Sequence, residues 1–260
     1  MKNTVQSGDF THLAQEYVKY RPGYSTVLAN ALFNYVDIQK EDFRVADVGA
    51  GTGIWSRYLL EQNLPCICVE PNDAMRGEGI EHTCSFPNVT WQSGSAEETG
   101  LDSNSVDWLT MASSFHWVET EVGLKEFKRV LKTGGHFTAL WNPRNTEGNE
   151  LHEAIERIIH DIAPNIKRKS SGGKKHVDDM YQTLTSTHDF ADVLFMETPY
   201  TMKRTKEEYI GAWRSVNDIQ AQAGPEKFEK IMTGISDYVD HLDFISVPYL
   251  VRAWTATVIK

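Results

Sequence analysis

Apolar residues recur at spacings of three and four near the amino terminus, and farther along the chain they gather in short runs between glycines and polar turns. Leu13, Tyr17 and Tyr20 fall on one face of a predicted helix, which residues 21–23 (Arg-Pro-Gly) end. A second helical series covers residues 27–35. The first 42 residues therefore predict a helical segment ahead of the first strand.

From residue 43 short apolar, β-branched runs alternate with stretches of helical periodicity. Such runs are typical of buried parallel strands, and their alternation with helices indicates βαβ units with right-handed crossovers. The predicted strands cover residues 44–48, 66–70, 89–92, 106–111 and 136–141.

The second half of the chain has a looser pattern. We expect a last strand over residues 249–259, where apolar and polar positions alternate, and we expect it to run antiparallel to its neighbours. The other elements predicted here are a helix over 151–162, a basic loop over 166–176, a strand over 190–202 and helices over 206–219 and 226–242.

Charge and composition exclude several classes of protein. The 260 residues carry 26 Lys and Arg against 36 Asp and Glu, a net charge of −10, which argues against nucleic acid or an anionic membrane as the main partner. Three cysteines are too few for a disulfide framework and fit a reducing compartment. No run approaches the roughly 20 apolar residues of a membrane span, and the amino terminus lacks the apolar stretch of a secretory signal. We therefore expect a cytoplasmic globular protein.

The most informative motif is Asp47-Val-Gly49-Ala50-Gly51-Thr-Gly53, which follows the first strand. Alternate glycines let the backbone turn sharply and let a ligand approach main-chain atoms, and the helix that follows directs free N–H groups towards it. The nicotinamide fingerprint needs a third glycine at position 54, where this chain has isoleucine.

An acid stands at the end of the next strand, as a second signal of ligand binding. Glu70 lies nineteen residues beyond Gly51, where an α/β sheet places a carboxylate that accepts hydrogen bonds from a ribose diol. The alternative is that any doubly wound protein has glycines at its first turn, but the two features together favour a nucleoside-binding site.

These residues resemble the class I S-adenosylmethionine-dependent methyltransferases, in the small-molecule branch that includes trans-aconitate methyltransferase-like enzymes. The resemblance runs from about Phe10 to Trp141 and is clearest in the glycine turn, around Glu70 and in Arg129-Val-Leu-Lys-Thr-Gly-Gly135. It implies S-adenosylmethionine as cofactor, with no metal. The cofactor site that it implies consists of Tyr20, Arg21, Asp47, Gly49, Ala50, Gly51, Gly53, Glu70, Pro71, Asn72, Met75, Ser95, Ala96, Glu97, Ala112 and Ser113.

One position departs from the family pattern. The family's adenine segment usually reads Gly-Asp-Ala-Glu, whereas this chain has serine at position 95. The hydrogen bond to the adenine amino group would then come from Glu97 or from a backbone carbonyl.

Methyl transfer from a sulfonium is an in-line displacement, so the protein mainly positions the reactants and excludes water. His116 follows the fourth strand and is the candidate catalytic residue, either as a base or as a residue that orients the acceptor. Six further residues are candidates for acceptor binding, with core packing or an exposed helix end as the alternatives: Tyr17, Phe115, Trp117, Asn142, Arg144 and Trp213. Trp213, Arg214 and Asn217 are expected on one helical face.

Two other features have less specific interpretations. The basic stretch over 167–175 is either a solvated loop or a mobile lid that recognises a carboxylate or phosphate. Cys66 and Cys68 form a poor zinc site and are expected in the core, while Cys84 falls in a loop.

The resemblance implies a Rossmann-like α/β fold, a seven-stranded, mostly parallel sheet with an antiparallel last strand and helices on both faces. We expect one domain over 1–260, with an amino-terminal helical cap (1–42), a cofactor-binding core (43–142), an inserted cap or lid (143–189) and a carboxyl-terminal part (190–260). The expected activity is methyl transfer to an oxygen, nitrogen or carbon of a small metabolite, with an acidic metabolite as one candidate. A cofactor-binding module without turnover and, less favoured, a nucleotide-dependent oxidoreductase are the alternatives. The sequence does not indicate an oligomeric state.

Overall fold

The computed structural model of the chain describes residues 11–167 and 174–260. These residues divide into two compact units. The sheet unit comprises residues 23–142, 174–198 and 251–260, and the helical unit comprises residues 11–22, 143–167 and 199–250. Strands β6 (Phe190–Thr205) and β7 (Phe244–Val258) run through both units.

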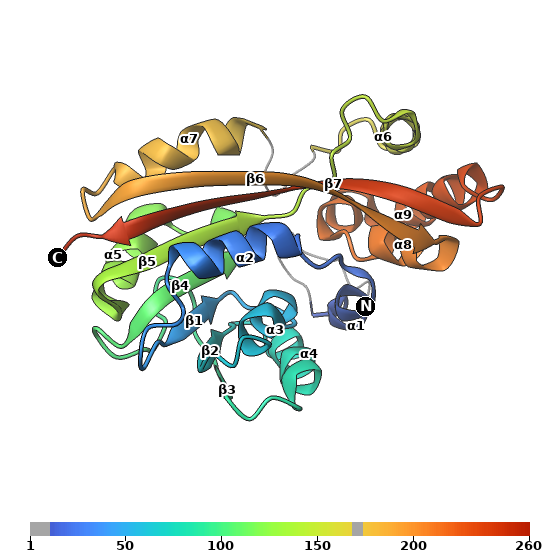
Figure 1. Cartoon of the computed structure of the whole chain (residues 1–260). Coiled ribbons are helices and arrows are strands. Elements are labelled where there is room, and N and C mark those ends of the chain that lie inside the picture. The colour runs from blue at the N-terminus through green and yellow to red at the C-terminus, as the bar shows by residue number, and fades with distance from the viewer. Residues whose placement is uncertain (1–10, 168–173) are drawn as a thin grey trace. The chain divides into compact units, whose positions relative to one another are not determined.

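The strands form one seven-stranded sheet in the order β3-β2-β1-β4-β5-β7-β6 (Figure 1). Strands β1 to β5 pair in parallel, and β7 pairs antiparallel with β5, from His136 opposite Thr257 to Trp141 opposite Arg252. This confirms the predicted mostly parallel sheet and its antiparallel last strand. The first five strands are β1 (Val45–Val48), β2 (Cys66–Val69), β3 (Val89–Gln92), β4 (Val106–Ala112) and β5 (Leu131–Trp141).

Apolar side chains from both faces of the central strands build the core of the sheet unit. All four residues of β1 are buried, which fits its short, continuous apolar run. Helix α5 presents Leu124, Phe127 and Val130 to this core at the spacing of one helical face. The helices of the sheet unit are α2 (Thr26–Tyr35), α3 (Ile54–Leu60), α4 (Asp73–Thr83), η1 (Phe115–Trp117), α5 (Thr120–Val130) and α7 (Lys174–Thr185).

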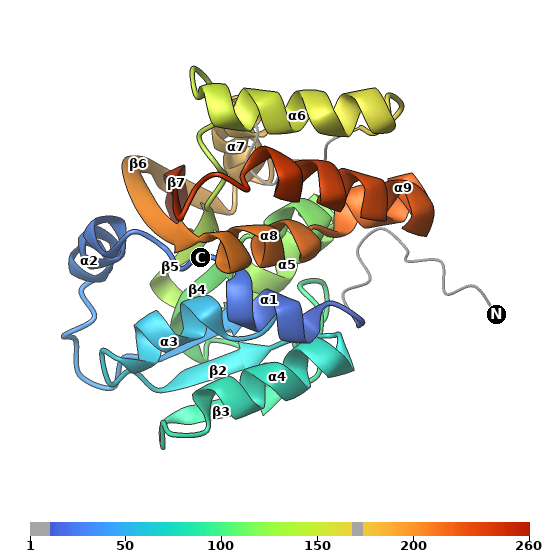
Figure 2. The ribbon, with the colours of Figure 1, turned by 90° about the vertical axis from the view of Figure 1, so that its right-hand side faces the viewer.

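The helical unit has a separate apolar core, which includes Ile155, Ile159, Ile231 and Ile235. Figure 2 shows α6 and α9, which supply these side chains, running alongside each other. The helices of the helical unit are α1 (Ala14–Tyr20), α6 (Glu150–Ile162), α8 (Lys206–Arg214) and α9 (Asn217–Tyr238).

The predicted helix over 206–219 is wrong. Helix α8 ends at Arg214, where the Ser215 side chain donates back to the carbonyl of Ala212, and extended backbone at Val216 precedes α9. Trp213 and Asn217 therefore lie on different helices and do not share a face.

Three other boundaries differ from the predictions. Helix α7 begins at Lys174, inside the predicted loop over 166–176, and its buried Met180 and Leu184 are four residues apart. Strand β5 begins at Leu131, five residues early, because Leu131 pairs with Val106 ahead of a bulge. Helix α9 consists of two helical segments: the first, from Asn217, was not predicted as a separate helix, and the second begins after Gly224, whose φ of 71° and ψ of 167° are not helical, close to the predicted residue 226.

Candidate nucleoside-binding site

The turn that joins β1 to α3 needs glycine for conformational and steric reasons. Gly49, Gly51 and Gly53 have φ angles of 66°, 59° and 76°, in the left-handed region that L side chains rarely adopt. A Cβ at Gly49 would lie 2.6 Å from the Ser114 hydroxyl oxygen. Glycine is therefore required at alternate positions because the backbone has positive φ angles there. The turn lies at the carboxyl edge of the sheet.

Glu70 closes this turn from the end of β2. Its Oε2 accepts the N–H of Gly51 at 2.8 Å and its Oε1 accepts the N–H of Asn72 at 2.9 Å. Glu70 is 7% exposed, and burial raises the pKa of its carboxyl although both N–H groups and Arg76 act in the opposite direction. Each oxygen has a second lone pair, so the carboxylate can still accept a hydrogen bond from a diol.

Helix α4 begins at Asp73, three residues after Glu70, and forms a side of the site. The Asn72 side chain accepts the N–H of Met75 at 3.0 Å and so caps this helix. The buried Met75 methyl lies 3.4 Å from the position that a Cβ at Gly51 would take. Arg76 donates to the carbonyl of Glu70 at 2.8 Å, which fixes the strand end, and Pro71 is exposed between them. Met75 thus gives the glycine turn an apolar neighbour.

Asp47 is fully buried and faces the interior of the sheet unit. Ser56 donates to one carboxyl oxygen at 2.6 Å and Thr110 donates to the other at 3.1 Å. Burial raises the pKa of Asp47 to about 7, and the charge of Glu70 adds to this increase. Asp47 therefore links the end of β1 to α3 and β4 and holds the strand that leads into the glycine turn in place.

The predicted adenine segment is a tight turn. The Ser95 hydroxyl accepts the N–H groups of Glu97 and Glu98, both at 3.2 Å, so it serves the local turn. Ala96 is buried, and Glu97 accepts the N–H of Glu119 at the start of α5 at 2.9 Å. One end of this segment is thereby attached to α5.

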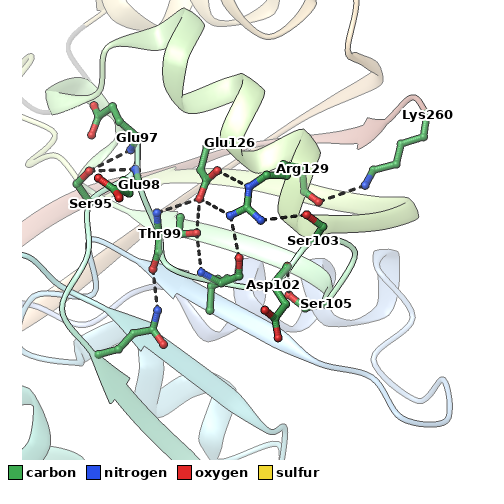
Figure 3. Close-up of polar contacts among 12 residues, drawn as sticks. Ser95, Glu97, Glu98, Thr99, Asp102, Ser103, Ser105, Glu126, Arg129 and Lys260 are labelled. Carbon is green, nitrogen blue, oxygen red and sulfur yellow. Dashed lines mark hydrogen bonds and ion pairs between the residues drawn. The ribbon is translucent and has the colours of Figure 1, made fainter.

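The carboxylate of Glu126, on α5, holds the other end of the segment (Figure 3). Glu126 Oε1 accepts both the N–H of Thr99, at 2.9 Å, and its hydroxyl, at 2.5 Å. Arg129 donates to both Glu126 oxygens at 2.8 Å. Burial opposes ionisation, but these donors lower the pKa of Glu126 to about 2. The sequence interpretation missed Glu126 and Thr99, and the only signal was a Glu–Arg pair three residues apart on an amphipathic helix.

The end of β4 brings together the residues predicted beneath the methyl group. Ser113 has a positive φ of 61°, its N–H donates to the carbonyl of Leu140 at 2.7 Å, and its hydroxyl lies 3.1 Å from the Tyr24 hydroxyl. Ala112, the last residue of β4, is partly buried. The strained backbone of Ser113 thus lies at the same carboxyl edge of the sheet as the glycine turn.

The aromatic candidates after β4 have different surroundings. Phe115 is 4% exposed and packs in the core against Phe127 and Phe137, whereas Trp117 is 44% exposed. The Trp141 indole N–H donates to Nδ1 of His116 at 3.4 Å. In a neutral His116 ring this contact favours the proton on Nε2.

The remaining candidate of the sheet unit is Asn142, which follows β5. Its amide donates to the carbonyl of Gly23 at 2.7 Å. Asn142 therefore connects the strand end to the segment that leads into α2.

Five predicted site residues belong to the helical unit. Tyr20 is buried, its hydroxyl donates to Glu207 at 3.0 Å, and its ring lies against Gly211. Arg21 donates to the carbonyl of Ser215 at 2.9 Å and lies 4.8 Å from the centroid of the Tyr17 ring. Their contact with a cofactor stays a prediction.

The other two residues of this set contact each other. The Arg144 guanidinium carbon lies 4.0 Å from the centroid of the Trp213 ring. Trp213 is 1% exposed, in the core of the helical unit. Their role in acceptor binding also stays a prediction.

Neither a metal site nor a membrane span is found in the described ranges 11–167 and 174–260. No three His, Cys, Asp or Glu side chains lie together there as a metal would require, and no helix there has the length and apolarity to cross a bilayer. Cys66 and Cys68 are buried, with their sulfur atoms 3.8 Å apart, and Cys84 is exposed at the end of α4. Of the predicted basic loop or lid, Arg168 and Lys169 lie outside the described residues.

Comparison with known sequences identifies a methyltransferase domain over residues 46–139. An uncharacterised methyltransferase of Mycobacterium tuberculosis is 35% identical over 125 residues, 46% of this chain and 49% of that protein. An uncharacterised methyltransferase-like protein of Schizosaccharomyces pombe is 25% identical over 252 residues, 93% of this chain and 92% of that protein. The chain thus spans about half the length of these mycobacterial relatives, and nearly all of the yeast protein.

Solved structures share the fold. The YcgJ protein of Bacillus subtilis has a TM-score of 0.55 at 17% identity, covering 91% of this chain and all of that chain. Phosphoethanolamine N-methyltransferase 2 of Haemonchus contortus, solved with S-adenosylhomocysteine, has a TM-score of 0.55 at 15% identity, covering 96% of this chain and 58% of that chain. The chain thus contains a methyltransferase domain, over residues 46–139, in a Rossmann-like fold that solved methyltransferases share.

Proposed function

We propose that the protein transfers the methyl group of S-adenosylmethionine to an oxygen, nitrogen or carbon of a small metabolite. The observation that carries this proposal is the position of Glu70, a buried carboxylate 2.8 Å from the N–H of Gly51. Parallel α/β sheets bind nucleosides at this edge, with an acid on the ribose.

The residues around Glu70 fit an adenosyl group. Gly49 packs against Ser114 with no room for a Cβ, and the buried Met75 offers an apolar surface to a planar base. The backbone from Ser95 to Thr99, held by α5, is the candidate edge for the adenine amino group. The cofactor supplies an activated methyl group, so the protein's own residues need only bind and orient the reactants and exclude water.

His116 is the residue of this edge best suited to contact the acceptor. The Trp141 N–H occupies Nδ1, so the neutral ring would present Nε2–H as a hydrogen-bond donor. A donor orients an acceptor and does not take its proton. We therefore favour a positioning role for His116 over a role as general base.

A small molecule is the expected acceptor, because a net charge of −10 disfavours nucleic acid. The three cysteines are free in the structure, and we infer a cytoplasmic location on that ground.

Two measurements test the proposal. Calorimetric titration with S-adenosylmethionine should give saturable binding, and no binding at millimolar concentration would contradict it. Release of S-adenosylhomocysteine is then followed over matched panels of carboxylic acids, amines and phenols. Binding without turnover on every panel would instead support a cofactor-binding module.

A further inference from the structure

A row of polar and aromatic side chains lies inside the helical unit. It starts at Arg144, three residues beyond the end of β5. Arg144 forms an isolated antiparallel bridge with Tyr249 and places its guanidinium over Trp213. Trp213 is followed by Tyr209, with ring centroids 6.3 Å apart, and Tyr209 by His152, with centroids 6.1 Å apart. Elements distant in sequence thus bring a cation, a phenol and an imidazole together.

The imidazole of His152 has a defined tautomer. Asn149 Oδ1 caps helix α6 by accepting the N–H of His152 at 3.1 Å, so this atom is an acceptor. The same oxygen lies 2.9 Å from Nδ1 of His152, which must therefore donate. Burial, and secondarily Arg144, lowers the pKa of His152 to about 4, so the ring is neutral at pH 7 and Nε2 has a lone pair.

That lone pair has no donor among the described residues. His152 is 1% exposed, and Nε2 is buried without a hydrogen-bond partner. A buried acceptor left without a donor destabilises the fold, and a ligand that supplies a hydroxyl or N–H group removes this penalty. The neighbouring Tyr209 is 1% exposed, and burial raises its pKa, so its hydroxyl keeps its proton.

We propose that Arg144, Tyr209 and His152 form a binding subsite for a hydroxycarboxylate group of the methyl acceptor. The guanidinium and the phenol donate to the carboxylate, and Nε2 of His152 accepts from the hydroxyl. The inference rests on the proposed function, which it deepens by naming the acceptor class. It needs no contribution from the glycine turn, because all three residues belong to the helical unit.

The test is calorimetry on the full chain saturated with S-adenosylhomocysteine, using pairs of acids that differ by one hydroxyl. The probes are malate with succinate, and mandelate with phenylacetate. In at least one pair the hydroxy acid should bind about tenfold more tightly, as one hydrogen bond allows. The His152→Phe variant should reduce that preference to within about twofold, while Arg144→Gln should weaken both members of the pair about tenfold.

The control is His160→Phe, which changes an exposed histidine of the same helix and should keep the preference. Nitrogen-15 NMR of His152 is measured on the wild-type protein, so it tests the subsite even if the phenylalanine variant fails to fold. Its Nε2 resonance should be that of an unprotonated nitrogen and should shift on addition of the hydroxy acid only. Equal binding of both members in every pair, or a His152 ring protonated on Nε2, would overturn the subsite. If S-adenosylhomocysteine itself does not bind, the proposed function fails, and this is measured separately.

Discussion

The main-chain N–H of Gly51 donates to Oε2 of Glu70 at 2.8 Å, so the glycine turn after β1 and the acid after β2 form one unit. The parallel register, with Val48 beside Val69, brings the two strand ends together. The hydrogen bond orders the carboxylate before any ligand arrives, and a preorganised acceptor lowers the entropic cost of binding a diol.

Gly51→Ala should weaken binding of S-adenosylhomocysteine at least tenfold, because a Cβ would project from the turn where a ligand approaches the backbone. Gly134→Ala is the matched control, since Gly134 also has a positive φ, of 73°, and open space around it. Both variants should lose about 1 kcal/mol of unfolding free energy through backbone strain. Calorimetry should show the loss of affinity in Gly51→Ala alone, and equal affinities of the two variants would contradict the site.

Asp47→Asn should become more stable relative to wild type as the pH rises. Below about pH 4 the carboxyl is protonated in both the folded and the unfolded chain. Between about pH 4 and pH 7 it ionises in the unfolded chain but not in the folded one, because its folded pKa is about 7. The wild type therefore loses stability over this window, by at most about 1.4 kcal/mol per pH unit.

Urea unfolding of wild type and Asp47→Asn at several pH values measures this difference directly. Rearrangement of the Ser56 and Thr110 hydroxyls around an amide adds an offset that does not vary with pH. A stability difference that stays constant from pH 4 to pH 7 would rule out the buried, protonated carboxyl.

Glu126→Gln should destabilise the protein at pH 7 by about 1–3 kcal/mol, because Arg129 and Thr99 lose a charged acceptor (Figure 3). The difference from wild type should narrow as the pH falls from about 4.5 towards 2, since protonation of Glu126 then removes the same charge. Adenosine affinity should also fall, because Thr99 anchors the candidate adenine segment. Glu121→Gln, an exposed change on the same helix, should have neither effect.

His116 should carry its proton on Nε2 at pH 8 if Trp141 donates to Nδ1. Long-range proton–nitrogen NMR distinguishes the two tautomers, and Trp141→Phe should shift the population towards the Nδ1-protonated form. A wild-type ring protonated on Nδ1 would restore His116 as a candidate base.

Local patterns were sufficient to predict the parallel strands and the glycine turn with its acid. The run over 45–48 is apolar and ends in glycines, and its neighbour over 66–69 ends at Glu70, so each signal lies within a few residues. The break between α8 and α9 was missed because helical periodicity continues through Ser215, while its side-chain hydrogen bond ends the helix there.

Most site features that the sequence did not predict depend on contacts between residues far apart in the chain. Glu126 reaches Thr99 across 27 residues, and Trp141 reaches His116 across 25. Arg144, His152 and Tyr209 come together only through the packing of the helical unit. Pairings of this kind depend on strand order and helix packing, which periodicity along one segment does not specify.

The central claim is that Glu70 and the glycine turn bind the adenosyl group of S-adenosylmethionine. Calorimetric titration of S-adenosylmethionine into wild type, Glu70→Gln and Glu81→Gln tests it most directly, with Glu81 as an exposed carboxylate on the neighbouring helix. Glu70→Gln should raise the dissociation constant by about ten- to a hundredfold, as the loss of a charged hydrogen-bond acceptor predicts, while Glu81→Gln should match wild type. Unchanged affinity in Glu70→Gln would contradict the claim.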